Sequence, residues 1–353
     1  MINSTSPANK ILLGLLFLGI TALSNAQGKS IYYPDFHSSE IMQSNTYVTR
    51  EHTGSLIAVD LETGERTLLS GAGKGNGPEF KRPNFFLDQP NNRLIVWDWF
   101  LKQLLSVELS SGDSTLIPFK HDGYTTLQLS DDTGRAISLT SDRESLHVYD
   151  VPSRERYGVP ININLKLEGY MDVEATRWTM DEENDRVILF VRDNFEEVSI
   201  YASDLKTGKL TVVSRWDRGE GPKLSNLIGD MRIDSQNNQL YLVDGGLKGI
   251  YRVDLATGDR TELSGRNRGE GPVLQLPRTI VLDVANNRLF VTTLFFHHVF
   301  SVDLETGARK LVSTMSQRNS LLDEDAGNSM AMDGVLDRFA NRLIFSNIRL
   351  EQR

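Results

Sequence analysis

The sequence lacks cysteine altogether, with none among its 353 residues. Disulfide bonds and thiolate chemistry are therefore excluded, even in a compartment that would permit disulfides. A lipid anchor on a cysteine behind the N-terminal apolar run is excluded for the same reason. The stability of the fold must come from packing, from a closed arrangement of sheets or from bound ions.

Positive charge is also scarce in this chain. Its 38 Lys and Arg residues stand against 47 Asp and Glu residues, which gives a formal net charge of −9 at pH 7. Nucleic acids and anionic membrane surfaces are recognised through basic patches. The charge balance therefore argues against both as partners.

The apolar run near the N-terminus is short. It extends from Ile11 to Leu23, follows Lys10 and precedes Ser-Asn-Ala ending at Ala26, whereas a helix that spans a bilayer needs about 20 apolar residues. These features predict a signal peptide over residues 1–26, a periplasmic or secreted protein, and no transmembrane segment after cleavage. An uncleaved membrane anchor is the less favoured alternative.

What the chain does contain is a repeat built on Leu-x-Thr-Gly. Copies occur as "DLETGERTLLSG" (60–71), "DLKTGKLTVVS" (204–214), "DLATGDRTELSG" (254–265) and "DLETGARKLVS" (303–313), with a weaker "ELSSG" at 108–112. Glycine in such a motif supplies the positive φ of a hairpin turn. Self-similarity at a period of about 20 to 50 residues indicates a solenoid or a propeller.

A second marker in each period is an apolar segment that ends in Asp and is followed by a polar, often Asn-rich turn. Its six copies place the aspartate at Asp88, Asp131, Asp181, Asp234, Asp283 and Asp337. Asp and Asn suit tight turns because they tolerate left-handed backbone conformations and bind neighbouring backbone groups. We expect each aspartate to accept hydrogen bonds from the backbone of the turn behind it.

Each period predicts four short strands. In the clearest copy they read "RTIVLD" (278–283), "RLFVTT" (288–293), "HVFSVDL" (298–304) and "RKLVS" (309–313), with the β-branched and aromatic residues typical of strands. Four-stranded sheets repeated around an axis form a β-propeller. The sequence therefore predicts an all-β, six-bladed β-propeller with four-stranded antiparallel blades.

The phase of the repeat also predicts how the ring closes. The chain ends on the first strand pair of a period (329–347) and begins on the second pair of one (55–70). Joining them completes a sixth blade beside blades expected at 82–118, 124–161, 174–214, 229–263 and 278–313. The propeller would occupy residues 55–353, after an N-terminal lead segment over residues 27–54.

One stretch resembles an NHL repeat. "GKGNGPEFKRPNFFLDQPNNRLIVWDWFLKQLLSVELSSG" (73–112) has the glycine-rich lead, the proline, the apolar strand ending in Asp and the closing glycine of that repeat. Residues 55–347 are similar to the wider group of six-bladed propellers that includes NHL, TolB-like and senescence-marker/gluconolactonase proteins. The resemblance implies a fold but not an activity, because this group includes lactonases, lyases, ligand carriers and interaction scaffolds.

Residues four positions before each strand-ending Asp form a ring of candidates for ligand binding. They are Asn84, Leu127, Arg177, Asp230, Thr279 and Asp333, and all but Leu127 are polar. If the first strand of each blade lines a central channel, these residues lie near its mouth, where they could orient a small hydroxylated or carboxylated molecule. Asn84, Asp230 and Asp333 could instead hold Ca²⁺ or another divalent cation. The plain alternative is a solvated mouth whose charges pair, such as Arg177 with Asp230.

Other candidates lie in the loops between the second and third strands. His297 and His298 are the only adjacent pair among six histidines, and one of them could act as a general base. Trp99 and Phe296 occupy comparable loops and could stack on a saccharide or on a partner's side chain. Alternatively, these aromatic residues cap the core between blades.

The pentapeptide "RGEGP" occurs twice, at 218–222 and 268–272, with a looser "GNGP" at 75–78. The repeat phase makes it the connector from the outer strand of one blade to the inner strand of the next, on the channel-mouth rim. In gluconolactonase-type propellers, a Glu beside Gly and Pro ligates a divalent ion. Here "VLQLP" separates Pro272 from the next strand, which is a departure from that pattern.

Two functions follow from this pattern. The first is a monomeric, non-enzymatic binding module for a small molecule, a saccharide or a protein at the channel-mouth face. The second is a metal-dependent lactonase, hydrolase or lyase that acts on a sugar-derived molecule at the same place.

Overall fold

The structure is a computed structural model of the whole chain. It describes residues 23–24, 30–31, 52–71, 73–98, 100–118, 126–129, 135–139, 145–150, 156–160, 174–192, 198–294, 298–317 and 329–350. The chain divides into a unit over Met1–Thr49 and a unit over Arg50–Arg353. In the first, β1 (Leu23–Ser24) pairs with β2 (Ser30–Ile31). The predicted signal peptide and lead segment stay predictions.

The second unit is built from four-stranded antiparallel sheets, as predicted, and each is called a blade here. Five blades are described with their side chains. They are β5 (Pro83–Asp88), β6 (Arg93–Asp98), β7 (Gln103–Glu108) and β8 (Ser114–Ile117); β13 (Glu174–Asp181), β14 (Arg186–Arg192), β15 (Val198–Asp204) and β16 (Leu210–Ser214); β17 (Ile228–Asp234), β18 (Gln239–Asp244), β19 (Gly249–Asp254) and β20 (Arg260–Ser264); β21 (Pro277–Asp283), β22 (Arg288–Thr293), β23 (His298–Asp303) and β24 (Arg309–Thr314); and β25 (Ser329–Asp337), β26 (Arg342–Leu350), β3 (His52–Asp60) and β4 (Arg66–Ser70).

A further four-stranded sheet joins β9 (Thr126–Leu129), β10 (Arg135–Leu139), β11 (Ser145–Asp150) and β12 (Arg156–Pro160), and only its backbone pairing is described. Five blades, not six, are therefore described in full. The predicted count of six is not confirmed and stays a prediction.

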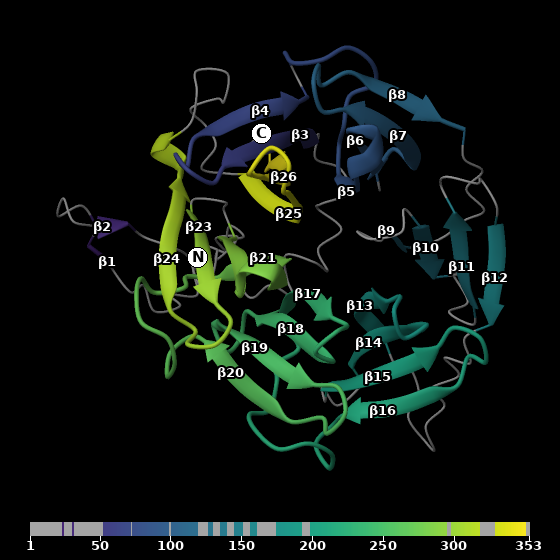
Figure 1. The fold of residues 1–353 in the computed structure, drawn as a ribbon, viewed down its shortest axis with the longest axis vertical. Helices are drawn as coiled ribbons and strands as arrows, with labels where there is room; N and C mark the ends of the chain where they lie inside the picture. The colour runs from purple at the N-terminus through teal and green to yellow at the C-terminus, as the bar shows by residue number, and fades with distance from the viewer. Residues whose placement is uncertain are drawn as a thin grey trace, which may run out of the picture. The chain divides into compact units, whose positions relative to one another are not determined.

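The first strand of each blade is its innermost strand (Figure 1). Strands β13, β17, β21, β25 and β5 contact one another in that order, each touching the first strand of the next blade. The fold is thus an all-β propeller, and its first strands carry the predicted ring of candidate residues. Among the described residues, no helix is long and apolar enough to cross a membrane.

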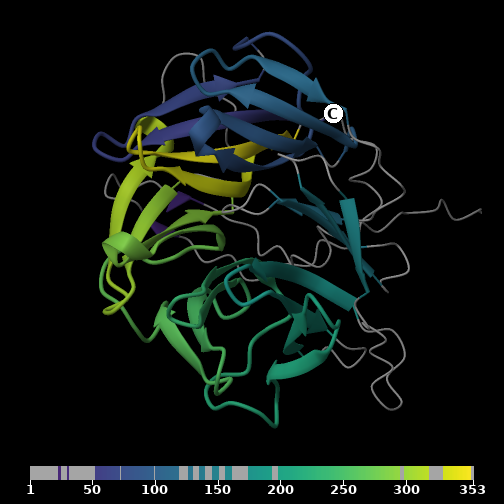
Figure 2. The ribbon, with the colours of Figure 1, turned by 45° about the vertical axis from the view of Figure 1, so that its right-hand side comes forward.

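The N-terminal and C-terminal strands of the second unit share one blade. Strand β26 pairs with β3 along a continuous antiparallel register from Arg342 opposite Asp60 to Leu350 opposite His52. Figure 2 shows the yellow C-terminal strands beside the purple N-terminal ones. The predicted pairing of these two ends of the propeller sequence is therefore present.

The strand-ending aspartates bind their turns partly as predicted. In the five fully described blades the first strand does end at the predicted aspartate. The carboxylate of Asp181, however, accepts hydrogen bonds from the side-chain amide of Asn184 and from Nε of Arg186, at 3.0 and 2.6 Å. The same Asp, Asn and Arg spacing recurs at Asp283. Asp234 and Asp337 also accept the predicted backbone hydrogen bonds, from the N–H groups of Asn237 and Ala340 at 3.1 and 3.2 Å.

The Thr-Gly turns between the third and fourth strands match the prediction. Gly258 has φ +86°, and Asp254 accepts hydrogen bonds from the backbone N–H groups of Ala256 and Thr257. Because glycine alone adopts this conformation without strain, the repeat spacing is set by turn chemistry.

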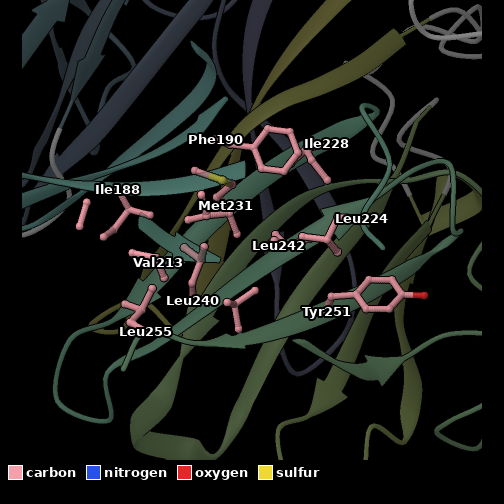
Figure 3. Close-up of a cluster of buried hydrophobic side chains, with 13 residues drawn as sticks. Ile188, Phe190, Val213, Leu224, Ile228, Met231, Leu240, Leu242, Tyr251 and Leu255 are labelled. Atoms are coloured by element: carbon pink, nitrogen blue, oxygen red, sulfur yellow. The ribbon is translucent and has the colours of Figure 1, made fainter. Parts of the chain in front are cut away.

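The hydrophobic core lies between blades. Figure 3 shows one cluster in which Ile188 and Phe190 of β14 meet Met231, Leu240 and Leu242 of the next blade. All five side chains are buried, and full burial of a large apolar side chain contributes about 1.5–3 kcal/mol. Similar clusters join the other described neighbours, so the blades that contain β17, β21 and β25 each pack on both neighbours.

Candidate functional site

Five polar members of the predicted ring lie at equivalent places on the inner strands. They are Asn84 on β5, Arg177 on β13, Asp230 on β17, Thr279 on β21 and Asp333 on β25. Leu127 lies on β9, whose side chains are outside the described residues. We call the five residues the inner-strand set. Four of them bind the backbone of the following blade.

The two aspartates of the set make the same contact. The N–H of Ile280 on β21 donates to Oδ2 of Asp230 at 3.0 Å, and the N–H of Phe85 on β5 donates to Oδ2 of Asp333 at 3.0 Å. Each carboxylate therefore ties its own inner strand to the next one in the ring. This contact explains why a polar residue occupies this place in an otherwise apolar strand.

Arg177 and Thr279 make the corresponding contact with donor and acceptor reversed. Nε of Arg177 donates to the carbonyl of Gly229 at 3.2 Å, and Oγ1 of Thr279 donates to the carbonyl of Ala331 at 3.0 Å. Burial lowers the pKa of Arg177, and the charge of Asp230 partly opposes that shift. The effect of the Asp230 charge on Arg177 partly supports the alternative in which these two charges pair, and Arg177 also donates to a backbone carbonyl.

Arg232 is the residue that sequence reasoning missed. Its Nη1 lies 2.9 Å from Oδ1 of Asp230, and its Nη2 lies 2.8 Å from Oδ1 of Asp333, two blades away. The three side chains are only 14, 16 and 18% exposed, in the order Arg232, Asp230, Asp333. The sequence signal that could have pointed to Arg232 is a basic residue between the apolar residues Met231 and Ile233 of the strand. The guanidinium forks between the two carboxylates that were expected to hold a cation.

Each of the two aspartates also accepts a hydrogen bond from the next residue of its own strand. The N–H of Met231 donates to Oδ1 of Asp230 at 2.8 Å, as the N–H of Gly334 does to Oδ1 of Asp333. Burial raises the pKa of Asp230; the nearby Arg232 charge lowers it and the Asp333 charge raises it further. In each carboxylate, Oδ1 therefore accepts from the Arg232 guanidinium and from a backbone N–H of its own strand, and Oδ2 accepts from a backbone N–H of another blade.

The predicted metal set does not fit a cation in this arrangement. Oxygen ligands must be turned towards the ion, whereas Asp230 and Asp333 are turned towards Arg232. Within the described ranges, no group of three or more His, Asp or Glu side chains is arranged to hold a metal ion. Asn84 lies on β5 next to Phe85, and its backbone pairs with Trp97.

Of the histidine and aromatic candidates, only His298 is described. His297, Trp99 and Phe296 lie outside the described residues. His298 is the first residue of β23, where the predicted third strand "HVFSVDL" begins, and its ring stacks on Phe300 with centroids 5.6 Å apart. Burial lowers its pKa, and the positive charge of Arg66 lowers it further.

The "RGEGP" loops enclose an arginine of the following blade. Nε of Arg260 donates to the carbonyl of Pro222 at 2.9 Å, and its Nη2 donates to the carbonyl of Gly219 at 3.0 Å. Its Nη1 donates to the carbonyl of Arg218 at 3.1 Å and to Oγ of Ser214. The loop thus wraps a guanidinium with its own carbonyl groups.

The second loop repeats this arrangement around Arg309. Its Nε donates to the carbonyl of Pro272 at 2.6 Å, its Nη2 to that of Gly269 at 3.0 Å and its Nη1 to Oγ of Ser264 at 2.8 Å. A Cβ at Gly269 would lie 2.0 Å from the carbonyl oxygen of Gly307. The loops are therefore the expected connectors, but their contacts are with the turn of the next blade's outer strands.

A serine at or near the end of four outer strands, β4, β16, β20 and β24, completes this junction. It donates to the glycine carbonyl of the next blade's Thr-Gly or Ser-Gly turn in the pairs Ser70–Gly112, Ser214–Gly258, Ser264–Gly307 and Ser313–Gly64, at 2.6 to 2.7 Å. Blades are thus joined at the inner strands by the inner-strand set and at the outer strands by these serines.

No family model matches the sequence, and no curated protein matches it either. Solved structures do resemble it. A chain from a crystal structure of a nidogen/laminin complex is 14% identical over 75% of this chain and 95% of that one, with a TM-score of 0.51. A structural genomics protein of unknown function from Bacteroides thetaiotaomicron is 10% identical over 85% of this chain and 77% of that one, with a TM-score of 0.52.

A putative TolB from Agrobacterium tumefaciens is also similar. It is 10% identical over 86% of this chain and 99% of its own, with a TM-score of 0.52. At these identities the likeness concerns the fold alone. Together with the four-stranded blades, it shows that the chain is a β-propeller similar to TolB-like and nidogen-complex propellers.

Proposed function

We propose that this protein is exported through its N-terminal signal peptide and acts, in the periplasm or outside the cell, as a monomeric binding module. Its scaffold would be a six-bladed propeller closed by the shared blade of β25, β26, β3 and β4. The pairing of β26 with β3 supports this closure. A propeller chain of similar fold occurs in a nidogen/laminin complex, which is consistent with a binding role for this chain.

The fork of Arg232 between Asp230 and Asp333 is the observation that favours binding over metal-dependent hydrolysis. To ligate Ca²⁺, each carboxylate would have to give up a guanidinium contact of 2.8 or 2.9 Å. Breaking a buried ion pair in this way is strongly unfavourable. Asp230 and Asp333 therefore serve as joints of the scaffold. Asn84, Arg177, Trp99 and Phe296 remain proposed contacts for a ligand at this face, whereas Thr279 is only 1% exposed.

Calcium titration and lactone turnover test this proposal together. We expect no saturable heat on calorimetric titration with CaCl₂, no rise in melting temperature with Ca²⁺, and no hydrolysis of aldonolactones. Calcium-dependent lactone turnover that is lost in Asp230→Asn and retained in Lys206→Met would contradict the binding proposal and establish the hydrolase. Lys206 is a suitable control because its ion pair with Asp185 is at the surface, with the two side chains 76 and 51% exposed.

Two deletions test the closure. Removing residues 27–70 deletes β3 and β4, leaves β26 with an open edge and should abolish cooperative unfolding, because an unpaired edge and blade face become exposed. Removing residues 27–49 leaves both strands and should keep the native melting temperature. A stable, cooperatively folded product of the longer deletion would refute closure by this blade.

A further inference from the structure

A pocket of about 180 Å³ lies where the outer strands of one blade meet the "RGEGP" loop of the next. Its wall includes Val198 and Ile200 at the start of β15, Leu224 behind the loop, Trp216 and Lys223. The pocket therefore combines an apolar wall with an aromatic ring and a cation. It lies at an outer junction between blades, away from the inner-strand set.

Trp216 is the feature of this pocket that the fold does not require. Trp216 is 70% exposed, whereas Trp97 and Trp178 are 2 and 8% exposed. Arg215 places its guanidinium carbon 6.0 Å from the centre of the indole ring. Tryptophan and arginine are the residue types that most often dominate binding energy at protein interfaces.

The neighbouring junction shows which residues the scaffold needs. "SRWDRGEGPKL" (214–224) and "SGRNRGEGPVL" (264–274) share the serine, the pentapeptide and the final leucine, and both loops enclose an arginine. They differ at four positions, where Arg215, Trp216, Asp217 and Lys223 correspond to Gly265, Arg266, Asn267 and Val273. The repeated contacts account for the shared residues, whereas the joint does not require Trp216 or Lys223, because the second junction lacks both.

Charge at this junction differs in sign from that of the chain. The wall of the pocket carries three basic residues, Arg215, Lys223 and Arg260, and no acidic one among the described residues, on a chain of net charge −9. Arg215 forms an ion pair with Asp217 at 2.6 Å, and Lys223 lies on the pocket wall. Charge complementarity favours an acidic partner here.

The size of the pocket decides between a small molecule and a side chain. Pockets for drug-sized ligands and cofactors are about 300–1,000 Å³, and this one is about 180 Å³, which suits one apolar side chain. We propose that the Trp216 pocket is a docking site for a partner protein that inserts one aromatic or aliphatic side chain flanked by Asp or Glu. This inference rests on the proposed binding function and names the class of its partner.

A labelled peptide tests the docking site on the full chain. The probe is a short fluorescein-labelled peptide with a central Phe between Asp and Glu residues, and the control probe carries Lys in place of each acid. Fluorescence anisotropy should show saturable binding of the acidic probe that weakens as salt is raised, because salt screens exposed charges. The basic probe should not bind.

The variants come in matched pairs from the two junctions. Trp216→Ala and Lys223→Glu should each weaken binding of the acidic probe by about tenfold or more. Arg266→Ala and Val273→Glu, at the corresponding places of the next junction, should leave it within about twofold. Melting temperatures should stay unchanged in all four variants, since the side chains are outside the core.

Three results would overturn the docking site. They are absence of binding by the acidic probe, equal binding of both probes, and equal affinity of the Trp216→Ala and wild-type chains. The chain could also self-associate without peptide and lose this association in Trp216→Ala. That result would make a second copy of the chain the occupant of the pocket and would reject the partner proposed here. Lactone turnover contradicts the binding function itself, whereas failure of the probe without turnover contradicts the docking site alone.

Discussion

Replacing Arg232 by Met tests whether the inner strands are held together by its fork. Met keeps much of the side-chain volume and removes the guanidinium from between Asp230 and Asp333. Both carboxylates would then remain largely buried, at 16 and 18% exposure, without their shared cation. The fold should survive, because the backbone N–H contacts of both aspartates persist.

The expected loss of stability is about 3 kcal/mol. Removing one partner of a buried ion pair costs about 3–5 kcal/mol, and we take the low end because the N–H donors still satisfy part of each carboxylate. For a large domain, about 1 kcal/mol corresponds to roughly 2 °C in melting temperature. Arg232→Met should therefore melt about 6 °C below the wild type, by the same conversion.

The variant should also show a particular dependence on pH. Burial already raises the pKa of Asp230, and removal of the Arg232 charge raises it further. An acid whose folded pKa is raised contributes stability at low pH and loses it as the pH rises through that pKa. The deficit of Arg232→Met against the wild type should thus be larger at pH 7 than at pH 4, which is near the ordinary pKa of an aspartate.

Urea unfolding followed by circular dichroism at both pH values measures this. The triple variant Asp230→Asn, Arg232→Met, Asp333→Asn removes the charges together and should recover most of the loss. Lys206→Met, which breaks an exposed ion pair, should change stability by about 1 kcal/mol or less. A loss under about 1 kcal/mol in Arg232→Met, or no recovery in the triple variant, refutes the assigned role of the fork.

Three further predictions concern the junctions and His298. Gly219→Ala should lower the melting temperature clearly, because a Cβ there would lie 1.9 Å from the carbonyl oxygen of Gly258. Gly73 also has a positive φ but has no atom within 4 Å of the added Cβ. Gly73→Ala should therefore lower the free energy of unfolding by only about 1–2 kcal/mol. Differential scanning calorimetry compares them, and equal losses would contradict the close contact. Arg260→Met leaves several loop carbonyls without a donor, so limited proteolysis should cut this loop faster than in the wild type; an unchanged rate would show that the loop holds without it. Burial lowers the pKa of His298, so its contribution to stability is complete above pH 6.5 and is lost as the pH falls through the lowered pKa. The melting temperature of His298→Gln should therefore fall less than that of the wild type from pH 7.5 to pH 5. An equal fall in both chains would count against the burial of His298.

Turn chemistry made much of the fold predictable from sequence. The first strands end at Asp88, Asp181, Asp234, Asp283 and Asp337 as predicted, because the local Asp, Asn and Gly pattern determines where each strand stops. The third-to-fourth-strand turns follow for the same reason. The donors to the strand-ending aspartates were predicted in part: backbone N–H groups of the turn bind Asp234 and Asp337, whereas side chains of Asn and Arg bind Asp181 and Asp283.

The contacts between blades were harder to predict. Arg232 binds an aspartate 101 positions away in sequence, and Arg260 is held by carbonyl groups that every residue type carries. Asp333 could be predicted as a polar residue of the ring, but nothing in one sequence pairs it with Arg232 or pairs Arg260 with these carbonyl groups. The inner-strand set could be found because its polar side chains interrupt an apolar repeat, but their use as joints depends on the next blade's backbone.

The blade-to-blade contacts have a consequence for how this sequence can change. Asp230 and Asp333 bind backbone N–H groups of the next inner strand, and Ser214 and Ser264 bind backbone carbonyls of the next turn. A backbone group is the same whatever side chain it carries. One blade can therefore acquire new surface residues without a compensating substitution in its neighbour, and a surface such as the one around Trp216 can diverge at a single junction of an otherwise repetitive ring.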